Sequence, residues 1–193
     1  MTTGNYLIGL DLGQSVDPAA LVVVERQPLA YAVCHARRLP LGTPYPEVVQ
    51  AVVALVAEPA LAGRVELVVD HSGVGRPVVD MLRQAVPCPV VPVTITSGRA
   101  VTRSREGGFR VPKSQLVDAV RVLLRGHRLQ VAAGLPEAEA LLRELRNFRV
   151  RITAAANETY GARSGAHDDL VLAAALACWW GQLRAGVPAG KKS

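Results

Sequence analysis

Residues 8–25 read IGLDLGQSVDPAALVVVE, and this stretch decides the fold. Two apolar runs, at 6–12 and 19–25, are predicted strands, and the Gly, Asp and Pro residues between them are typical of a tight connection. A third apolar run, 29–38, follows Pro28. Because these connections are too short for a crossover, the three strands are predicted to form an antiparallel meander.

Helices and strands alternate after the meander. In order, the pattern predicts a helix over 44–57, a strand over 64–70, a helix over 77–84, a strand over 89–95, helices over 113–125 and 136–146, a strand over 148–154 and a helix over 167–183. Residues 97–110 and 155–165 are predicted loops, and 184–193 a disordered tail. The order predicts one α/β domain over 1–183, with a mixed central sheet (the antiparallel three-strand meander plus parallel strands) flanked by helices.

The composition favours a polyanionic partner. The 193 residues carry 22 Lys+Arg against 16 Asp+Glu, which gives a net charge of +6 and a pI near 9.7. The three cysteines, Cys34, Cys88 and Cys178, fit neither a disulfide framework nor a zinc motif, so we expect them to be reduced and mostly buried in a cytoplasmic protein. The first residues do not resemble a signal peptide, and no apolar run reaches the about 20 residues that span a bilayer, so we expect no membrane association.

Carboxylates occupy the edges of apolar elements, where solvated surface charge is not expected. Asp11 interrupts the first strand, Asp70 ends the fourth, and Asp168 and Asp169 open the last helix. In an open α/β sheet, sites form at strand ends, and acids brought together there repel one another. Two hard cations would relieve that repulsion, activate a water and stabilise the leaving oxygen of a phosphodiester.

Each acid except Asp11 has an alternative interpretation. Asp168 or Asp169 would be favourable as a helix cap alone, and Asp70 suits an Asx-turn. Asp17 is interpreted as a turn residue rather than a ligand. The occurrence of the acids together, in this order of elements, favours the metal-binding interpretation.

Four stretches resemble the nuclease domain of phage terminase large subunits, which has the RNase H-like fold. They are GLDLGQSVDPAALVVVE (9–25), VELVVDHSGVGRPVVDML (65–82), GFRVPKSQLVDAVRVLLRGHRLQV (108–131) and ARSGAHDDLVLAAALACWW (162–180). The resemblance spans about Tyr6 to Trp180. It implies an RNase H-like fold and a two-metal-ion DNA endonuclease, using Mg²⁺ or Mn²⁺, that acts in phage or prophage DNA packaging.

By that resemblance, Asp11, Asp70 and one of Asp168 or Asp169 are the metal-binding acids. One ion would be held by Asp11 and Asp168, and the other by Asp11 and Asp70. Neighbouring helical residues point roughly 100° apart, so Asp168 is favoured as the ligand, with Asp169 as a second ligand or an orienting residue. His167 would contact the phosphate or a metal, or would cap the helix.

DNA would be held through its backbone, with little sequence preference and strong salt dependence. Arg99, Arg103, Arg105 and Lys113 are the candidate phosphate contacts, and the basic loop 97–110 is expected to lie against the duplex. A solvated surface role is the alternative for each of them.

The sequence contains no G-x-x-x-x-G-K-[ST] phosphate loop, so ATP-driven translocation is not ascribed to it. The expected partners are DNA and a separate packaging ATPase, small terminase subunit or portal. The expected location is the cytoplasm of a bacterial host, as a phage or prophage-derived protein.

Three other functions compete with this interpretation. A Holliday-junction resolvase has the same fold and similar acids. A non-catalytic DNA-binding or assembly module would keep the fold alone. The segment IGLDLGQS also resembles actin-like and sugar-kinase ATPases, but a second Asp-x-Gly strand motif is missing.

Overall fold

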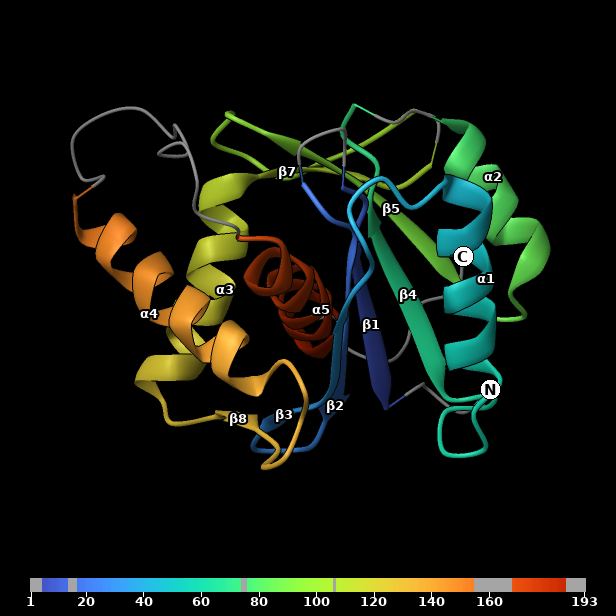
Figure 1. The fold of residues 1–193 in the computed structure, drawn as a ribbon. Coiled ribbons are helices and arrows are strands. Elements are labelled where there is room, and N and C mark those ends of the chain that lie inside the picture. The colour runs from blue at the N-terminus through green and yellow to red at the C-terminus, as the bar shows by residue number, and fades with distance from the viewer. Residues whose placement is uncertain (1–4, 14–16, 74–75, 106, 155–167, 187–193) are drawn as a thin grey trace.

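A computed structural model describes residues 5–13, 17–73, 76–105, 107–154 and 168–186. Within these residues the centre is an eight-stranded mixed sheet with the strand order β6-β7-β5-β4-β1-β2-β3-β8 (Figure 1). The strands are β1 (Tyr6–Asp11), β2 (Ala20–Arg26), β3 (Tyr31–Arg38), β4 (Val65–Asp70), β5 (Val90–Thr96), β6 (Thr102–Arg103), β7 (Phe109–Pro112) and β8 (Leu129–Val131).

The predicted meander is confirmed, because β1 pairs antiparallel with β2, and β2 with β3. The predicted parallel strands are confirmed as well, since β4 lies parallel to β1, and β5 parallel to β4. Two antiparallel steps make β3 parallel to β1. The carboxyl ends of β1, β3, β4 and β5 therefore lie at one edge of the sheet.

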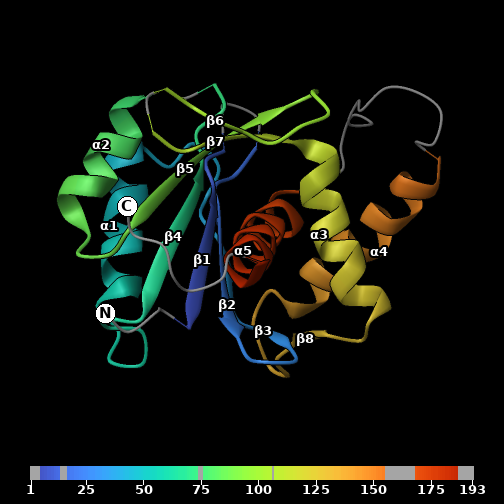
Figure 2. The same ribbon diagram turned by 180° about the vertical axis from the view of Figure 1, so that it is seen from behind.

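Helices cover both faces of the sheet (Figures 1 and 2). On one face lie α1 (Tyr45–Val56) and α2 (Arg76–Ala85), and on the other lie α3 (Lys113–Arg125), α4 (Ala138–Ala154) and α5 (Asp169–Gly186). Alternate strand residues point to opposite faces, and each face has its own apolar core. This arrangement defines three layers.

Helix α5 lies between the sheet and the pair α3 and α4 (Figure 2). Every residue from Asp169 to Trp179 is buried, which explains why its apolar residues form no single stripe. A Cβ added at Gly9 in β1 would lie 1.8 Å from the carbonyl oxygen of Ala173. Glycine in the strand and alanines in the helix therefore permit this close approach.

The carboxyl-terminal half of α5 is tied to the sheet by polar contacts. Trp180 donates a hydrogen bond from Nε1 to Glu66 on β4 at 2.7 Å. Arg184 lies 3.6 Å from the other oxygen of Glu66. These contacts fix the end of α5 that lies away from its acidic start.

Two predicted element types are wrong. Residues 97–110 are not a loop throughout: they contain β6 and the start of β7, which form a hairpin with Gly107 and Gly108 at positive φ between its strands. Phe109 packs against Trp179 with a centroid distance of 5.5 Å, and this contact anchors the hairpin. Residues 148–154 are not a strand but the last part of α4, because Phe148 continues the buried helical series of Leu141 and Leu145.

The strand β8 was not predicted; it pairs in parallel with β3 at the sheet edge. Helix α5 runs to Gly186, so the predicted tail begins too early, while residues 187–193 and the predicted loop 155–165 lie outside the described residues. All three cysteines are free thiols, but only Cys178 is buried and Cys34 is exposed, so the expectation of mostly buried cysteines is wrong. Within the described ranges, no helix has the length and apolarity needed to cross a membrane.

Candidate active site

Asp11 and Asp70 lie side by side at the carboxyl ends of two parallel strands. They are direct register partners in the pairing of β1 with β4. Alternate residues of a strand point to the same face of the sheet, so Asp11 points to the same face as Gly9, and Asp70 to the same face as Glu66. Gly9 and Glu66 both contact α5. The two carboxylates therefore project from the sheet toward the face that α5 covers.

Asp70 is held in place by Ser72, two positions beyond the end of its strand. The backbone N–H and the hydroxyl of Ser72 both donate to Oδ1 of Asp70, at 2.8 and 2.5 Å. Burial raises the pKa of Asp70, which is only 8% exposed, and the hydrogen bonds from Ser72 oppose that rise. On the same loop, His71 Nε2 lies 3.1 Å from the Thr94 hydroxyl of β5. These contacts orient Asp70 at the sheet edge.

Asp11 has the most perturbed electrostatic environment of the acids. Burial is the largest cause that holds its pKa well above the ordinary value. The negative charge of Asp70 raises this pKa next most, followed by those of Asp169 and Asp168. The ammonium of Lys113 lowers it. The four predicted acids and Lys113 are therefore close enough to form one electrostatically coupled group.

Asp168 and Asp169 begin α5 but face different cations. The carbonyl of Asp168 accepts the N–H of Leu172 at 2.9 Å, as expected of an N-cap residue, and its Oδ2 lies 3.4 Å from Lys113 Nζ. Asp169 is only 3% exposed, and its Oδ2 accepts a hydrogen bond from Arg38 Nε at 2.5 Å. The structure thus separates the roles of the two residues. His167 lies outside the described residues.

This donor set suits a hard divalent cation. Carboxylate oxygens are the ligands that Mg²⁺ and Mn²⁺ prefer. Among the described residues, no three His, Cys, Asp or Glu side chains already converge closely enough to hold an ion. Lys113 and Arg38 each balance one carboxylate of α5, which leaves the repulsion between Asp11 and Asp70 for a cation to relieve. The residues fit the metal in chemistry and charge.

The four basic candidates fall in two places. Lys113 is in the acidic group, and it lines a hollow of about 340 Å³ together with Arg99 and Ser114. Arg103 lies in the β6–β7 hairpin, with its guanidinium 5.3 Å from the ring centroid of Phe109. Arg105 is exposed in the turn of the same hairpin. Lys113 therefore lies beside Asp168 and shares a hollow with Arg99, whereas the other two lie on the β6–β7 hairpin.

Sequence reasoning missed three residues of this site. His71 and Ser72 directly follow Asp70, and their position was the only available signal. Arg38 ends β3, 131 positions before Asp169, and nothing in the sequence around it indicates a partner. Only the register of the sheet brings it to the site.

Solved structures define the class of this fold. The large terminase nuclease from thermophilic phage G20c with bound magnesium aligns with a TM-score of 0.63 and 25% identity, over 92% of this chain and 82% of that one. The human cytomegalovirus terminase nuclease domain, soaked with manganese, aligns with a TM-score of 0.55 and 10% identity, over 91% and 82%. The chain has the RNase H-like fold of large-terminase nuclease domains, as predicted.

Two relatives found by sequence similarity are phage proteins. The terminase large subunits of Thermus phage G20c and Thermus virus P23-45 are each 29% identical to this chain over 173 residues. The matched region is 89% of this chain but only 31% of either relative, so the chain spans about a third of their length. No protein-family model matches the sequence. The resemblance to terminase large subunits inferred from the four motifs is confirmed.

Proposed function

We propose that this chain is a metal-dependent endonuclease that hydrolyses DNA phosphodiesters, as one terminase-like nuclease domain. The observation that carries the proposal is the pairing of Asp11 with Asp70 on adjacent parallel strands, coupled electrostatically to the acids that begin α5. The similarity to terminase large subunits supports the same chemistry. The proposed setting is phage or prophage DNA packaging in the bacterial cytoplasm, with DNA and a packaging ATPase, small subunit or portal as partners.

Asp11, Asp70 and Asp168 would hold the metal, which we propose is a pair of Mg²⁺ or Mn²⁺ ions. When bound, such ions supply the Lewis acidity that activates water and stabilises the leaving 3′ oxygen. Asp11 would contribute to holding both ions, because it is the register partner of Asp70 and also feels the charges of Asp168 and Asp169. Asp70 keeps a fixed orientation through Ser72. The acids repel one another, and a bound cation would relieve this repulsion, so their arrangement favours cation binding.

The protein's own cations would position the substrate. Lys113, which lies 3.4 Å from Asp168, lines one hollow with Arg99, and the charges of both suit the phosphates of a DNA strand. Arg103 and Arg105 lie on the hairpin, where they would contact the backbone further along the duplex. Because every proposed contact goes to phosphate, cleavage should depend little on sequence.

Cleavage of supercoiled plasmid tests the proposed function. We expect nicking or linearisation with Mg²⁺ or Mn²⁺, none with EDTA, and none by Asp70→Ala with either metal. A four-way junction of equal length serves as a competing substrate, because preferential cutting there would favour a resolvase. Folded wild-type protein that cuts nothing with either metal would overturn the proposal, and cleavage that survives Asp70→Ala would remove this site from it.

The hairpin arginines are expected to contribute to DNA affinity. Replacing Arg103 and Arg105 by alanine should weaken binding to any duplex and lower the slope of log affinity against log salt by about 2, since two phosphate contacts are lost. Fluorescence anisotropy over a salt series measures both quantities. The matched control is Arg26→Ala with Arg64→Ala, since these residues lie at the opposite edge of the sheet. Equal slopes for the two double variants would exclude the hairpin from the DNA interface.

A further inference from the structure

Arg38 shares a row of the sheet with two of the acids. The register pairs Asp70 with Asp11, Asp11 with Ala20, and Ala20 with Arg38, across four adjacent strands. Side chains in one such row point to the same face. Ala20 is small and fully buried, so the row leaves space between Asp11 and Arg38. The start of α5 carries Asp169 to Arg38.

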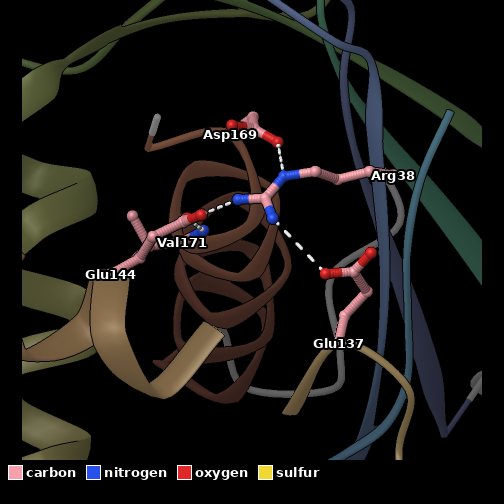
Figure 3. A network of polar contacts seen from close by, with 5 residues as sticks. All are labelled: Arg38, Glu137, Glu144, Asp169 and Val171. Carbon is pink, nitrogen blue, oxygen red and sulfur yellow. Dashed lines mark hydrogen bonds and ion pairs between the residues drawn. The ribbon is translucent and has the colours of Figure 1, made fainter. Parts of the chain in front are cut away.

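The guanidinium of Arg38 binds three carboxylates from three separate positions in the chain (Figure 3). Nε donates to Asp169 on α5, Nη2 donates to Glu144 on α4, and Nη1 lies 3.3 Å from Glu137. Asp169 and Glu144 are 3% and 7% exposed. A planar fork with several donors suits this task, because each nitrogen takes a different carboxylate.

Glu144 links this group to the backbone of α5. Its second oxygen accepts the N–H of Val171 at 2.9 Å, and that N–H belongs to the first turn of the helix (Figure 3). The first N–H groups of a helix have no partner within the helix itself. Arg38 therefore fixes the start of α5 twice, through the side chain of Asp169 and through Glu144.

We propose that Arg38 is a positioning residue that sets the affinity of the site for divalent cations. It touches neither Asp11 nor Asp70 in any contact described above, and it acts by holding Asp169 and the first turn of α5. That turn carries Asp168 toward the other acids. Three carboxylates against the one guanidinium keep the region net negative, so Arg38 can hold α5 without making the surroundings repel a cation. This inference rests on the proposed function.

The test measures the affinity for Mn²⁺. Binding is detected as the loss of the free-ion signal in electron paramagnetic resonance, and DNA cleavage is measured in parallel. Arg38→Met is expected to weaken Mn²⁺ binding about 10- to 100-fold, the usual effect of losing a residue that supports metal ligands. Arg38→Lys should fall between wild type and Arg38→Met, because lysine keeps the charge but lacks the planar fork. In cleavage, the half-saturating Mn²⁺ concentration should rise more than the rate at saturation falls.

Arg184→Met is the matched control, since Arg184 also ties α5 to the sheet through a glutamate, but at the other end of the helix. Its Mn²⁺ affinity should equal that of wild type. An Arg38→Met protein with a lower melting temperature but wild-type Mn²⁺ affinity would overturn the inference and leave the proposed function intact. Wild-type protein that binds no Mn²⁺ would overturn both. If Arg38→Met does not fold, Arg38→Met/Glu144→Gln takes its place with the same expectation, because it removes one buried charge.

Discussion

Replacing Asp11 by asparagine is expected to lower DNA cleavage on the order of 10³-fold, the upper end for one electrostatic group, and to raise the melting temperature of the protein in EDTA. The amide keeps the shape of the side chain but removes the charge that the proposed ions share. The same charge is unfavourable without metal, because burial and the neighbouring Asp70 hold the pKa of Asp11 well above its ordinary value. Activity and metal-free stability should therefore change in opposite directions.

The pH dependence follows from the direction of this shift. A raised pKa means that the folded protein binds the Asp11 proton more tightly than the unfolded chain does. The wild type therefore loses stability, relative to Asp11→Asn, as the pH rises from the ordinary value of 3.8 to the raised value. Thermal melts in EDTA between pH 4 and pH 8 should show the difference growing with pH, and saturating Mn²⁺ should reduce it.

Asp118→Asn is the control for this experiment. Asp118 is a half-exposed carboxylate on α3 that pairs with Arg121, and it lies more than one helical turn beyond Lys113 and roughly 140° around the helix from it. It should alter neither cleavage nor the pH dependence of the melting temperature. An Asp11→Asn protein that cleaves DNA at the wild-type rate would exclude Asp11 as a ligand. A variant that is less stable than wild type in EDTA at pH 8 would contradict the electrostatic account.

Gly9→Ala adds a single methyl group and is expected to destabilise the protein strongly. The added Cβ would lie 1.8 Å from the carbonyl oxygen of Ala173 and 2.7 Å from its carbonyl carbon. Because both atoms are backbone in a buried helix, α5 must shift as a whole. We expect a loss of about 3 kcal/mol, the upper end of ordinary overpacking, and a melting temperature lower by about 10 °C.

The same shift should impair the site, since α5 carries Asp168 and Asp169. Urea unfolding measures the stability, and cleavage below the melting temperature measures the site. Gly186→Ala is the control, because a Cβ there meets nothing within 4 Å and alanine is the better helix former. Equal stability of Gly9→Ala and wild type would mean that α5 does not approach β1 as closely as described.

The acids were predictable because each breaks a local pattern. Asp11 stands in an apolar strand and Asp70 ends one, and the RNase H-like fold implied by the motif resemblance brings the two strands together. The predicted helix starting near residue 167 likewise carried Asp168 and Asp169 to the same edge. The local sequence pattern and the geometry of the sheet both place the acids at the same edge of the sheet. The candidate site therefore needed no long-range information beyond the fold.

The supporting residues were not predictable, because their partners are distant in sequence. Arg38 meets Asp169 through the register of β3 and the path of α5. The β6–β7 hairpin was hidden for a related reason: its short strands hold because Phe109 packs on α5, a contact with no local signature. The tail of α4 looked like a strand because β-branched residues are frequent there, but packing of its first part sets its structure.

The position of α5 late in the chain would give the proposed nuclease a delay during synthesis. Asp11 and Asp70 leave the ribosome before Asp168 and Asp169, which arrive with α5, the helix that packs between the sheet and α3 and α4. At about 5–20 residues per second, the chain spends several seconds with the first acids made and the last absent. A half-translated chain therefore lacks two of the proposed acids, and under the proposed function it would not cut DNA before α5 is made.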